Sequence, residues 1–362
     1  NRSVLAVEEP DPSDPAAVPA PTALSNPAPL RPFEGLTRTY GIPDYWDLDP
    51  TLLAALLFLL MFGAMFGDVG QGAVLAALGL ALAGGRIVAG QRDLGRVLVG
   101  CGFSAIVFGL LYGSVFGSED LIPALWFRPL EDPLLLVAVA VAFGVVVISA
   151  GLILGLASAW RRRDLASLFL GQSGMLGLWL YWGLVVVAML AVIDPGRLSP
   201  WMLVLLVGAP LLLFLLRDPI VGALGWVEAR DGVSAVEAGV EAFDLVIRFA
   251  SNTISFLRVG AFALAHIGLG LTVFVLADLV RGLPLASVAI LIVGNVITIA
   301  LEGLIVGIQA LRLEYYEFFT KFLRGGGVPY RPFALERRGA PSLRLQRPAV
   351  KSQGADFGGR SE

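Results

Sequence analysis

Two arginines lie inside apolar stretches of the chain, where charged side chains are rare. Arg258 stands in the run 251–277, and Arg312 stands near the end of the run 288–313. A charge at the centre of a bilayer costs about 3 kcal/mol or more, so it persists only where a polar cavity or an opposite charge receives it. The two arginines therefore predict a membrane protein that handles protons, ions or charged substrates.

A row of mostly polar residues runs through the stretch that carries Arg312. Its members recur three or four residues apart, and they are Asn295, Thr298, Glu302, Ile305, Gln309, Arg312 and Tyr316. This spacing predicts one face of an α-helix. Glu302 and Arg312 are separated by roughly 15 Å of helix, so they can interact only indirectly. The face either lines a polar path or joins neighbouring helices through hydrogen bonds.

A second row with the same spacing carries Arg258. It consists of Glu241, Asp244, Arg248, Ser251, Ser255, Arg258, Phe262 and Ala265, and His266 adjoins it. Asp244 and Arg248 are spaced as an ion pair within one helix, at the expected membrane edge. No acid lies four residues from Arg258, so we expect its counter-charge to come from elsewhere. Hydrogen bonding between helices is again the alternative role for the serines and for His266.

The remaining polar candidates have ordinary structural explanations. Asp68 follows MFGAMFG and precedes VGQG, a setting typical of a helix N-cap. The single Cys101 lies in apolar sequence, where a buried, inert thiol is expected. One His and one Cys leave little material for a metal site, and no nucleotide-binding or hydrolase motif occurs. We therefore predict no cofactor.

The composition is that of a membrane protein. Hydrophobic residues make up 57% of the chain, charged residues make up only 15%, and the mean hydropathy is +0.80. Soluble domains carry about a quarter charged residues, so the soluble class is excluded. The net charge of −3, with no basic stripe interleaved with aromatics, gives no indication of a nucleic-acid partner.

Eight apolar segments are interpreted as membrane helices, which need about 20 residues each. They span roughly 50–67, 69–85, 96–117, 133–158, 167–193, 200–216, 237–280 and 285–323. We therefore expect an all-α integral membrane protein with about eight transmembrane helices. The first two segments are short. The last two are too long for perpendicular spans and should tilt or continue into water.

Three regions are expected along the chain. Residues 1–45 are predicted to be a Pro- and Ala-rich linker from a missing N-terminal cytoplasmic domain. Residues 46–324 form the predicted eight-helix transmembrane domain, and residues 325–362 form a basic cytoplasmic tail.

The charges of the connections predict the orientation. Basic residues gather on alternate connections and near the carboxyl end, and they include Arg86, Arg92, Arg96, Arg161, Arg162, Arg163 and Lys321. The opposite loops carry acids, namely Glu119, Asp120, Glu131, Asp132 and Asp194. By the positive-inside rule both termini face the cytoplasm, and an even number of spans agrees with this.

Four stretches of the sequence resemble one family. They are NPAPLRPFEGLTRTYGIPDYWDLDPT (26–51), MFGAMFGDVGQG (61–72), SNTISFLRVGAFALAH (251–266) and EGLIVGIQALRLEYYEFFTKFLRGGGVPYRPF (302–333). They are similar to the membrane domain of the rotary V/A-type ATPase subunit that is called I in bacteria and archaea and a in eukaryotes. The resemblance covers about residues 26–333, and its two carboxyl-terminal motifs are specific.

This resemblance implies a function and a set of partners. The chain would be the stator membrane subunit of a rotary ATPase in a prokaryotic cell membrane. It would form proton half-channels against a rotor ring and couple proton translocation to ATP hydrolysis or synthesis, without being an enzyme by itself. Its partners would be the ring of proteolipid subunits, the other stator and central-stalk subunits, and the lipid bilayer. The ring would mainly decide between H⁺ and Na⁺ as the coupling ion.

The resemblance also implies roles by position. Arg258 would match the essential arginine that faces the ring, and Arg312 would match the second arginine of that pair. Other positions would line the proton path, namely Glu302, Gln309, His266, Asp244 and Ser255, with Asp68 and Glu241 as further candidates. Gln309 stands where eukaryotic relatives often have His, which argues against a titrating relay at that position.

A secondary transporter with a charged-substrate site between its helices is the alternative function. That class is built from inverted repeats with broken helices at the membrane midplane. No convincing repeat relates the two halves of this sequence. A rotor ring that co-purifies with the protein would distinguish the two functions.

Overall fold

The computed structural model describes most of the chain. The described residues are 20–45, 47–85, 90–119, 121–225, 235–323 and 325–330. The chain divides into two compact units, Asn1–Pro329 and Tyr330–Glu362, and every element below belongs to the first. The predicted tail beyond residue 330 and residues 1–19 of the predicted linker lie outside the described residues.

The regular structure of the described residues is almost entirely helical. The first half of the chain contains α1 (Arg31–Tyr40), α2 (Thr51–Met65), α3 (Val69–Ala83), α4 (Arg92–Tyr112), α5 (Pro133–Arg161), α6 (Leu165–Leu170) and α7 (Met175–Ile193). The strands β1 (Pro21–Thr22) and β2 (Val328–Pro329) pair in parallel and join the two ends of the described chain. The all-α class predicted from the sequence is therefore confirmed at this level.

The second half contains shorter helical pieces as well as long ones. They are η1 (Pro195–Arg197), α8 (Pro200–Leu203), η2 (Val204–Gly208), α9 (Ala209–Leu215), α10 (Arg217–Ala223), α11 (Ala235–Ser255), α12 (Leu257–Leu279), α13 (Pro284–Ile297), η3 (Thr298–Glu302), α14 (Gly303–Leu313), η4 (Glu314–Phe318) and η5 (Phe319–Lys321). Among these, η2, η3 and η4 are π-helical turns, and η1 and η5 are 3₁₀ turns.

Five helical stretches in the described residues are long and apolar enough to cross a membrane. They are Arg92–Tyr112, Pro133–Arg161, Leu165–Ile193, Val236–Leu279 and Pro284–Lys321. A sixth crossing results if the bent pair Pro200–Leu215 and Arg217–Ala223 is one span. The first two predicted segments are α2 and α3, which are apolar but have only 15 residues each. The predicted great length of the last two segments is confirmed, at 44 and 38 residues.

The predicted segment 200–216 is not a single straight helix. Ala209 donates its N–H to the carbonyl of Val204 in a π turn, and the chain then bends by 59° at Leu216. Pro219 lacks the N–H that would bond to the carbonyl of Leu215 one turn earlier, which accounts for a bend at this point.

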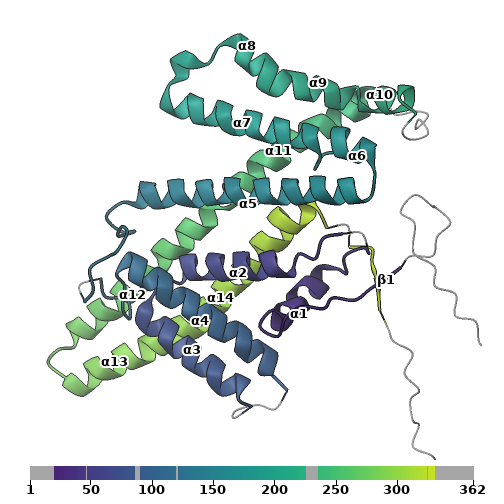
Figure 1. The fold of residues 1–362 in the computed structure, drawn as a ribbon. Coiled ribbons are helices and arrows are strands. Elements are labelled where there is room, and N and C mark those ends of the chain that lie inside the picture. The colour runs from purple at the N-terminus through teal and green to yellow at the C-terminus, as the bar shows by residue number, and fades with distance from the viewer. Residues whose placement is uncertain are drawn as a thin grey trace, which may run out of the picture. The chain divides into compact units, whose positions relative to one another are not determined.

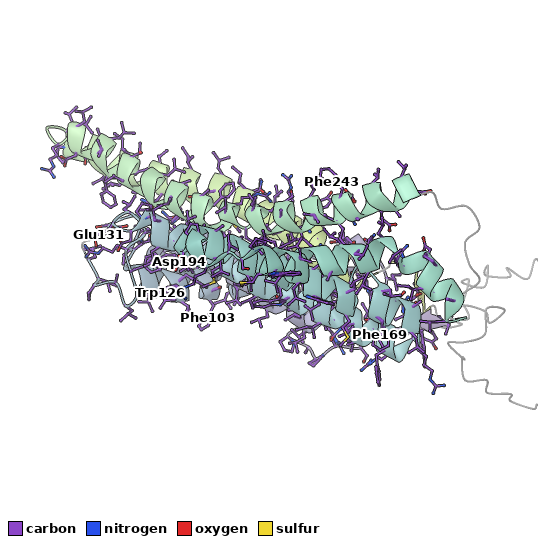
Figure 2. All side chains as sticks on the ribbon, turned by 90° about the horizontal axis from the view of Figure 1, so that it is seen from above. Phe103, Trp126, Glu131, Phe169, Asp194 and Phe243 are labelled. Atoms are coloured by element: carbon purple, nitrogen blue, oxygen red, sulfur yellow. The ribbon has the colours of Figure 1, made fainter. Side chains whose placement is uncertain are left out.

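The long helices α11 to α14 run obliquely to α2 and α5 (Figure 1). Figure 2 shows Glu131 and Asp194 at one end of the helices, with Phe169 and Phe243 at the opposite end. The acidic connections after α4 and α7 therefore lie at the same end, as the alternation of the loops predicted.

The hairpin of α3 and α4 is packed backbone to backbone. A Cβ added to Gly102 would lie 2.7 Å from the carbonyl oxygen of Gly72, and one added to Gly95 would lie 2.8 Å from that of Gly79. Such distances exclude a side chain, so small residues are required where the two helices cross. This close packing holds the N-terminus of α3, and with it Asp68, against the end of α4.

Candidate functional site

Arg258 and Arg312 line one cavity of about 640 Å³. The cavity lies between α11, α12, α14 and η4, and its walls are formed by Ser251, Asn252, Ser255, Arg258, Ile308, Leu311, Arg312, Tyr315, Tyr316 and Glu317. Two arginines predicted from separate stretches of sequence thus meet in space, together with the predicted Ser255. The arginine cavity, as we call it, contains polar groups inside an otherwise apolar helical region.

A break between α11 and α12 positions Arg258. Phe256 interrupts the helical hydrogen bonding, since its N–H donates to the carbonyl of Thr253 and its carbonyl accepts from the N–H of Val259. Its ring is fully buried against α5 at Gly144, where an added Cβ would lie 2.6 Å from a Phe256 ring carbon. Phe256 therefore fixes the start of α12, and Arg258 is the second residue of that helix.

The charges around Arg258 come from other elements. Arg312 is close enough to repel Arg258, and Glu317 on η4 is close enough to attract it. The Nη1 atom of Arg258 is buried and has no hydrogen-bond partner among the described residues. The sequence-based expectation that the counter-charge comes from elsewhere is met in part by Glu317, which lies 59 positions further along the chain.

Glu317 was not among the predicted site residues, and the reason is geometric. Glu317 lies five positions after Arg312, which places the two about 140° apart on an ideal α-helix. The π turn η4, in which Phe319 donates to the carbonyl of Glu314, contains more residues per turn and turns Glu317 toward the arginines. The π turns η3 and η4 also mean that the predicted row from Asn295 to Tyr316 is not one face of a regular α-helix.

His266 and Glu302 form a second polar site. His266 Nδ1 and Glu302 Oε2 are 2.8 Å apart, and both side chains are buried. The ring of Phe66 lies against His266, with 4.8 Å between the ring centroids. His266 lies roughly 12 Å along α12 from Arg258, so the pair is separate from the arginine cavity. Both residues were predicted, but their pairing was not.

Three of the predicted polar-path residues have a buried side-chain atom that makes no hydrogen bond within the described part of the protein. His266 Nε2, Glu302 Oε1 and Gln309 Oε1 have no hydrogen-bond partner among the described residues. A buried polar atom without a partner costs about 1–3 kcal/mol, so unpaired groups are rare unless something outside the chain satisfies them. The predicted polar path thus contains groups able to bond water or a partner protein.

The predicted row of polar residues that carries Arg312 begins at Asn295, at the end of the row that is remote from the arginines. The amide oxygen of Asn295 accepts a 3.0 Å hydrogen bond from Nε2 of Gln71, which is buried in α3. Gln71 was not singled out from the sequence, although it stands in the VGQG stretch. Asn295 and Arg312 lie roughly 25 Å apart along the helix, so polar contacts accompany it for most of a membrane thickness.

Asp68 is the N-cap of α3 and is completely buried. Its carboxylate accepts hydrogen bonds from the N–H of Gln71 (2.8 Å), the hydroxyl of Ser114 (2.8 Å) and the N–H groups of Phe116 (2.9 Å) and Gly117 (2.7 Å). These bonds join α3 to the loop after α4. They confirm the capping interpretation, and a place for Asp68 on the proton path stays a prediction.

Glu241 and Asp244 belong to a third group near the start of α11. Asp244 pairs with Arg248, as predicted, and Arg248 also donates to the amide oxygen of Gln172 at 3.3 Å. Gln172 in turn donates to Glu241 at 2.9 Å, and Arg217 lies 3.5 Å from Glu241. The structure therefore places these two acids in a partly exposed network, roughly 20–25 Å along the helices from Arg258.

Lys321 is not the exposed residue that its place among the orientation-setting basic residues suggested. It is buried, with its Nζ 5.2 Å from the centre of the Phe249 ring. The amide of Asn252, with its oxygen turned toward Lys321, accepts a 2.7 Å hydrogen bond from that Nζ. A charge enclosed in this way says little about which side of the membrane is basic, because the rule counts residues in loops.

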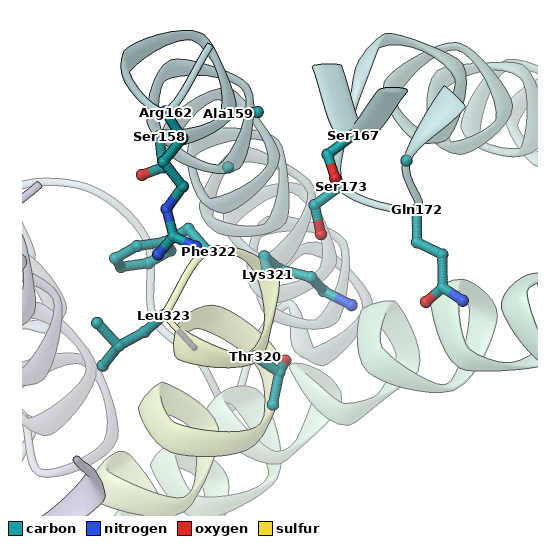
Figure 3. A pocket seen from close by; sticks show the side chains of 12 residues that line it. Ser158, Ala159, Arg162, Ser167, Gln172, Ser173, Thr320, Lys321, Phe322 and Leu323 are labelled. Carbon is teal, nitrogen blue, oxygen red and sulfur yellow. The ribbon is translucent and has the colours of Figure 1, made fainter. Parts of the chain in front are cut away.

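Lys321 also lines a cavity of about 210 Å³ next to the end of α5 (Figure 3). Figure 3 shows Ser158 and Arg162 on one side of it and Ser173 and Gln172 on the other.

Arg162 pairs with Asp47 at 2.5 Å and with Asp44 at 3.4 Å. Burial raises the pKa of the Asp47 carboxyl, and the positive charge of Arg162 opposes that rise.

A family model matches the chain in two blocks that contain these sites. The model describes the V-type ATPase 116kDa subunit family, and it matches residues 11–117 and 232–335. The first block carries Asp68 and Gln71. The second block carries the arginine cavity and the His266–Glu302 pair.

The chain is also similar to curated proteins that are all named A-type ATP synthase subunit I. The chain is 28% identical to the A-type ATP synthase subunit I of Pyrococcus horikoshii, over 88% of the chain and 48% of the relative. It is 29% identical to that of Halobacterium salinarum and 31% identical to that of Aeropyrum pernix, in each case over 88% of the chain and 52% of the relative. The chain spans about half the length of these relatives. On the family match over more than half of its residues, the chain belongs to the V-type ATPase 116kDa subunit family.

Proposed function

We propose that this chain is the stator membrane subunit of a rotary V/A-type ATPase and that it does not bind nucleotide itself. It forms proton half-channels against a rotor ring of proteolipid subunits and couples proton translocation to ATP hydrolysis or synthesis. The observation that carries the proposal is the buried Nη1 of Arg258, which faces no acceptor among the described residues although it lies in a cavity inside an apolar helical region.

The chemistry of the cavity suits a carboxylate supplied by a partner. A ring carboxyl group is neutral while it faces lipid, because a bare charge there is expensive. Near Arg258 its ionised form is favoured, by about 4 kcal/mol for charges about 4 Å apart at an effective dielectric constant near 20. Arginine suits this task because it stays charged and offers a planar fork to a carboxylate. The proton thus leaves the ring where the carboxylate meets Arg258.

Two polar sites flank the arginine cavity along α11 and α12, which supports two separate half-channels. Glu241 and Asp244 lie near the start of α11, and His266 lies beyond Arg258 on α12, paired with Glu302. We assign the first group to the cytoplasmic half-channel and the His266–Glu302 pair to the opposite one. Eight membrane crossings, cytoplasmic termini and contacts with the other stator and central-stalk subunits belong to the same proposal.

Replacement of Arg258 tests this function. Arg258→Gln should reduce ATP-driven proton pumping by at least a hundredfold, because the amide cannot stabilise the ionised ring carboxylate. Arg258→Lys should also be poor, since an ammonium lacks the guanidinium fork and can lose its proton when buried. The measurement is the initial rate of acidification in proteoliposomes that contain the whole complex, normalised to assembled complex.

Arg281→Gln is the matched control. Arg281 is exposed after α12 and pairs with Asp278, so its replacement should leave pumping within twofold of the unchanged protein. Pumping by assembled Arg258→Gln complexes at the rate of this control would overturn the proposed function.

A further inference from the structure

Glu317 is an acid enclosed by positive charges. Its side chain is buried, it lines the arginine cavity, and it is electrostatically coupled to Arg258, Arg312 and Lys321. Ser255 lies beside its carboxylate. An acid buried among apolar residues is costly, so its presence here requires the attraction of the surrounding cations.

The elements packed against η4 bring few other ionisable groups. Tyr315 and Tyr316 share the cavity wall. Of the neighbouring helices, α2 carries no ionisable side chain, and α5 carries only Arg161, at its last residue. On α1, Tyr40 packs against Tyr315, with 5.6 Å between the ring centroids. On α11, Arg248 lies close enough to Lys321 to repel it, and the acids Glu237, Glu241 and Asp244 lie nearer the start of that helix. Among the described residues, Glu317 is therefore the one acid that lines the arginine cavity.

Glu317 attracts the arginines without forming a direct ion pair with either of them. Among the described residues, no ion pair within 4.0 Å joins Glu317 to Arg258 or to Arg312. A direct bidentate pair would use the planar donor groups of a guanidinium and leave less for a second carboxylate. At a greater distance the negative charge still offsets the mutual repulsion of the two arginines, because the screening inside a protein is weak.

We propose that Glu317 is a positioning residue, which keeps Arg258 and Arg312 in one cavity and lowers the net positive charge that the ring carboxylate meets. This inference rests on the proposed function. Its consequence is that the ring carboxylate can be reprotonated after it passes the arginines. Without the acid, two uncompensated positive charges would retain the carboxylate in its ionised form.

A carbodiimide that modifies only protonated carboxyl groups provides the test. In the assembled complex, Glu317→Gln should move the pH of half-maximal labelling of the ring subunit down by about one unit, because one negative charge about 10 Å away is lost. The pH optimum of ATP-driven pumping should shift in the same direction. Glu317→Asp retains the charge and should restore both pH profiles to within a few tenths of a unit.

Glu314→Gln is the matched control. Glu314 is a buried acid in the same π turn, three residues earlier, but it does not line the arginine cavity. The Glu314→Gln substitution should leave the pH profile of carbodiimide labelling of the ring subunit unchanged. If Glu317→Gln also left that profile unchanged in assembled complexes, the positioning role would be wrong. If Arg258→Gln at the same time abolished pumping, the proposed function would stand without this inference.

Discussion

Replacements of the polar-path residues should slow proton pumping to different extents, because each replacement removes a different chemical group. Glu302→Gln deletes a buried carboxylate that hydrogen-bonds His266, so it should slow ATP-driven acidification about tenfold without abolishing it. Gln309→Ala should be milder, within about threefold, because no proton needs to reside on an amide. Arg312→Ala should fall between Glu302→Gln and Arg258→Ala, since one of two positive charges remains. Initial rates in proteoliposomes, normalised to assembled complex, check this order.

The order itself is the informative result at this scale. A loss with Gln309→Ala as large as that with Arg258→Ala would contradict the graded electrostatic effect. Gln309 would then have to be a direct structural or coordinating group. His266→Ala provides an internal comparison, because it removes the partner of Glu302 and should slow pumping about as much as Glu302→Gln.

At the scale of elements, the break between α11 and α12 determines where Arg258 lies. Phe256→Ala should remove the buried ring that fixes the break and should cost about 3–5 kcal/mol of stability through the cavity left behind. Pumping should fall as well, because Arg258 is two residues away and loses its fixed position. Thermal unfolding of the purified complex and proton pumping are the two measurements.

Phe243→Ala is the control for this experiment, since Phe243 is exposed on α11, the helix that ends at this break (Figure 2). Its loss should change stability by no more than about 0.5 kcal/mol. Equal effects of the two substitutions would show that the break does not depend on Phe256, and the position of Arg258 would need another explanation.

At the scale of the whole molecule, the ends of the helices predict the topology. Arg161 at the end of α5 and Glu131 before α5 should face opposite sides of the membrane, with Arg161 cytoplasmic. Single cysteines at these positions, in a Cys101→Ala background, should react with an impermeant maleimide from opposite sides of oriented vesicles. Both positions are exposed, whereas Ser158 is buried and unsuitable for labelling.

The protein with only its native Cys101 serves as the negative control, because that thiol is buried and should not be labelled from either side. Labelling of both introduced cysteines from the same side would show that α5 does not cross the membrane. The assignment of the half-channels to the two sides would then fail as well.

Local features of the sequence determined the class of this protein. Apolar runs predicted membrane helices, and the last two proved as long as expected because hydropathy depends only on consecutive residues. Arg258 and Arg312 stood out for the same reason, since a charge in an apolar run needs no tertiary information to be recognised. The Asp244–Arg248 pair was predictable because both residues lie one turn apart on one helix.

Only the tertiary structure decided which partners meet across the chain. Glu302 pairs with His266 from another helix, and Lys321 is buried against Phe249, although it was counted among the basic residues that set the orientation. Glu317 reaches the arginine cavity through a π turn, which has no reliable signature in the period of a sequence. Hydrophobic period is a property of neighbouring residues, whereas the counter-charge of a buried arginine depends on how distant helices pack.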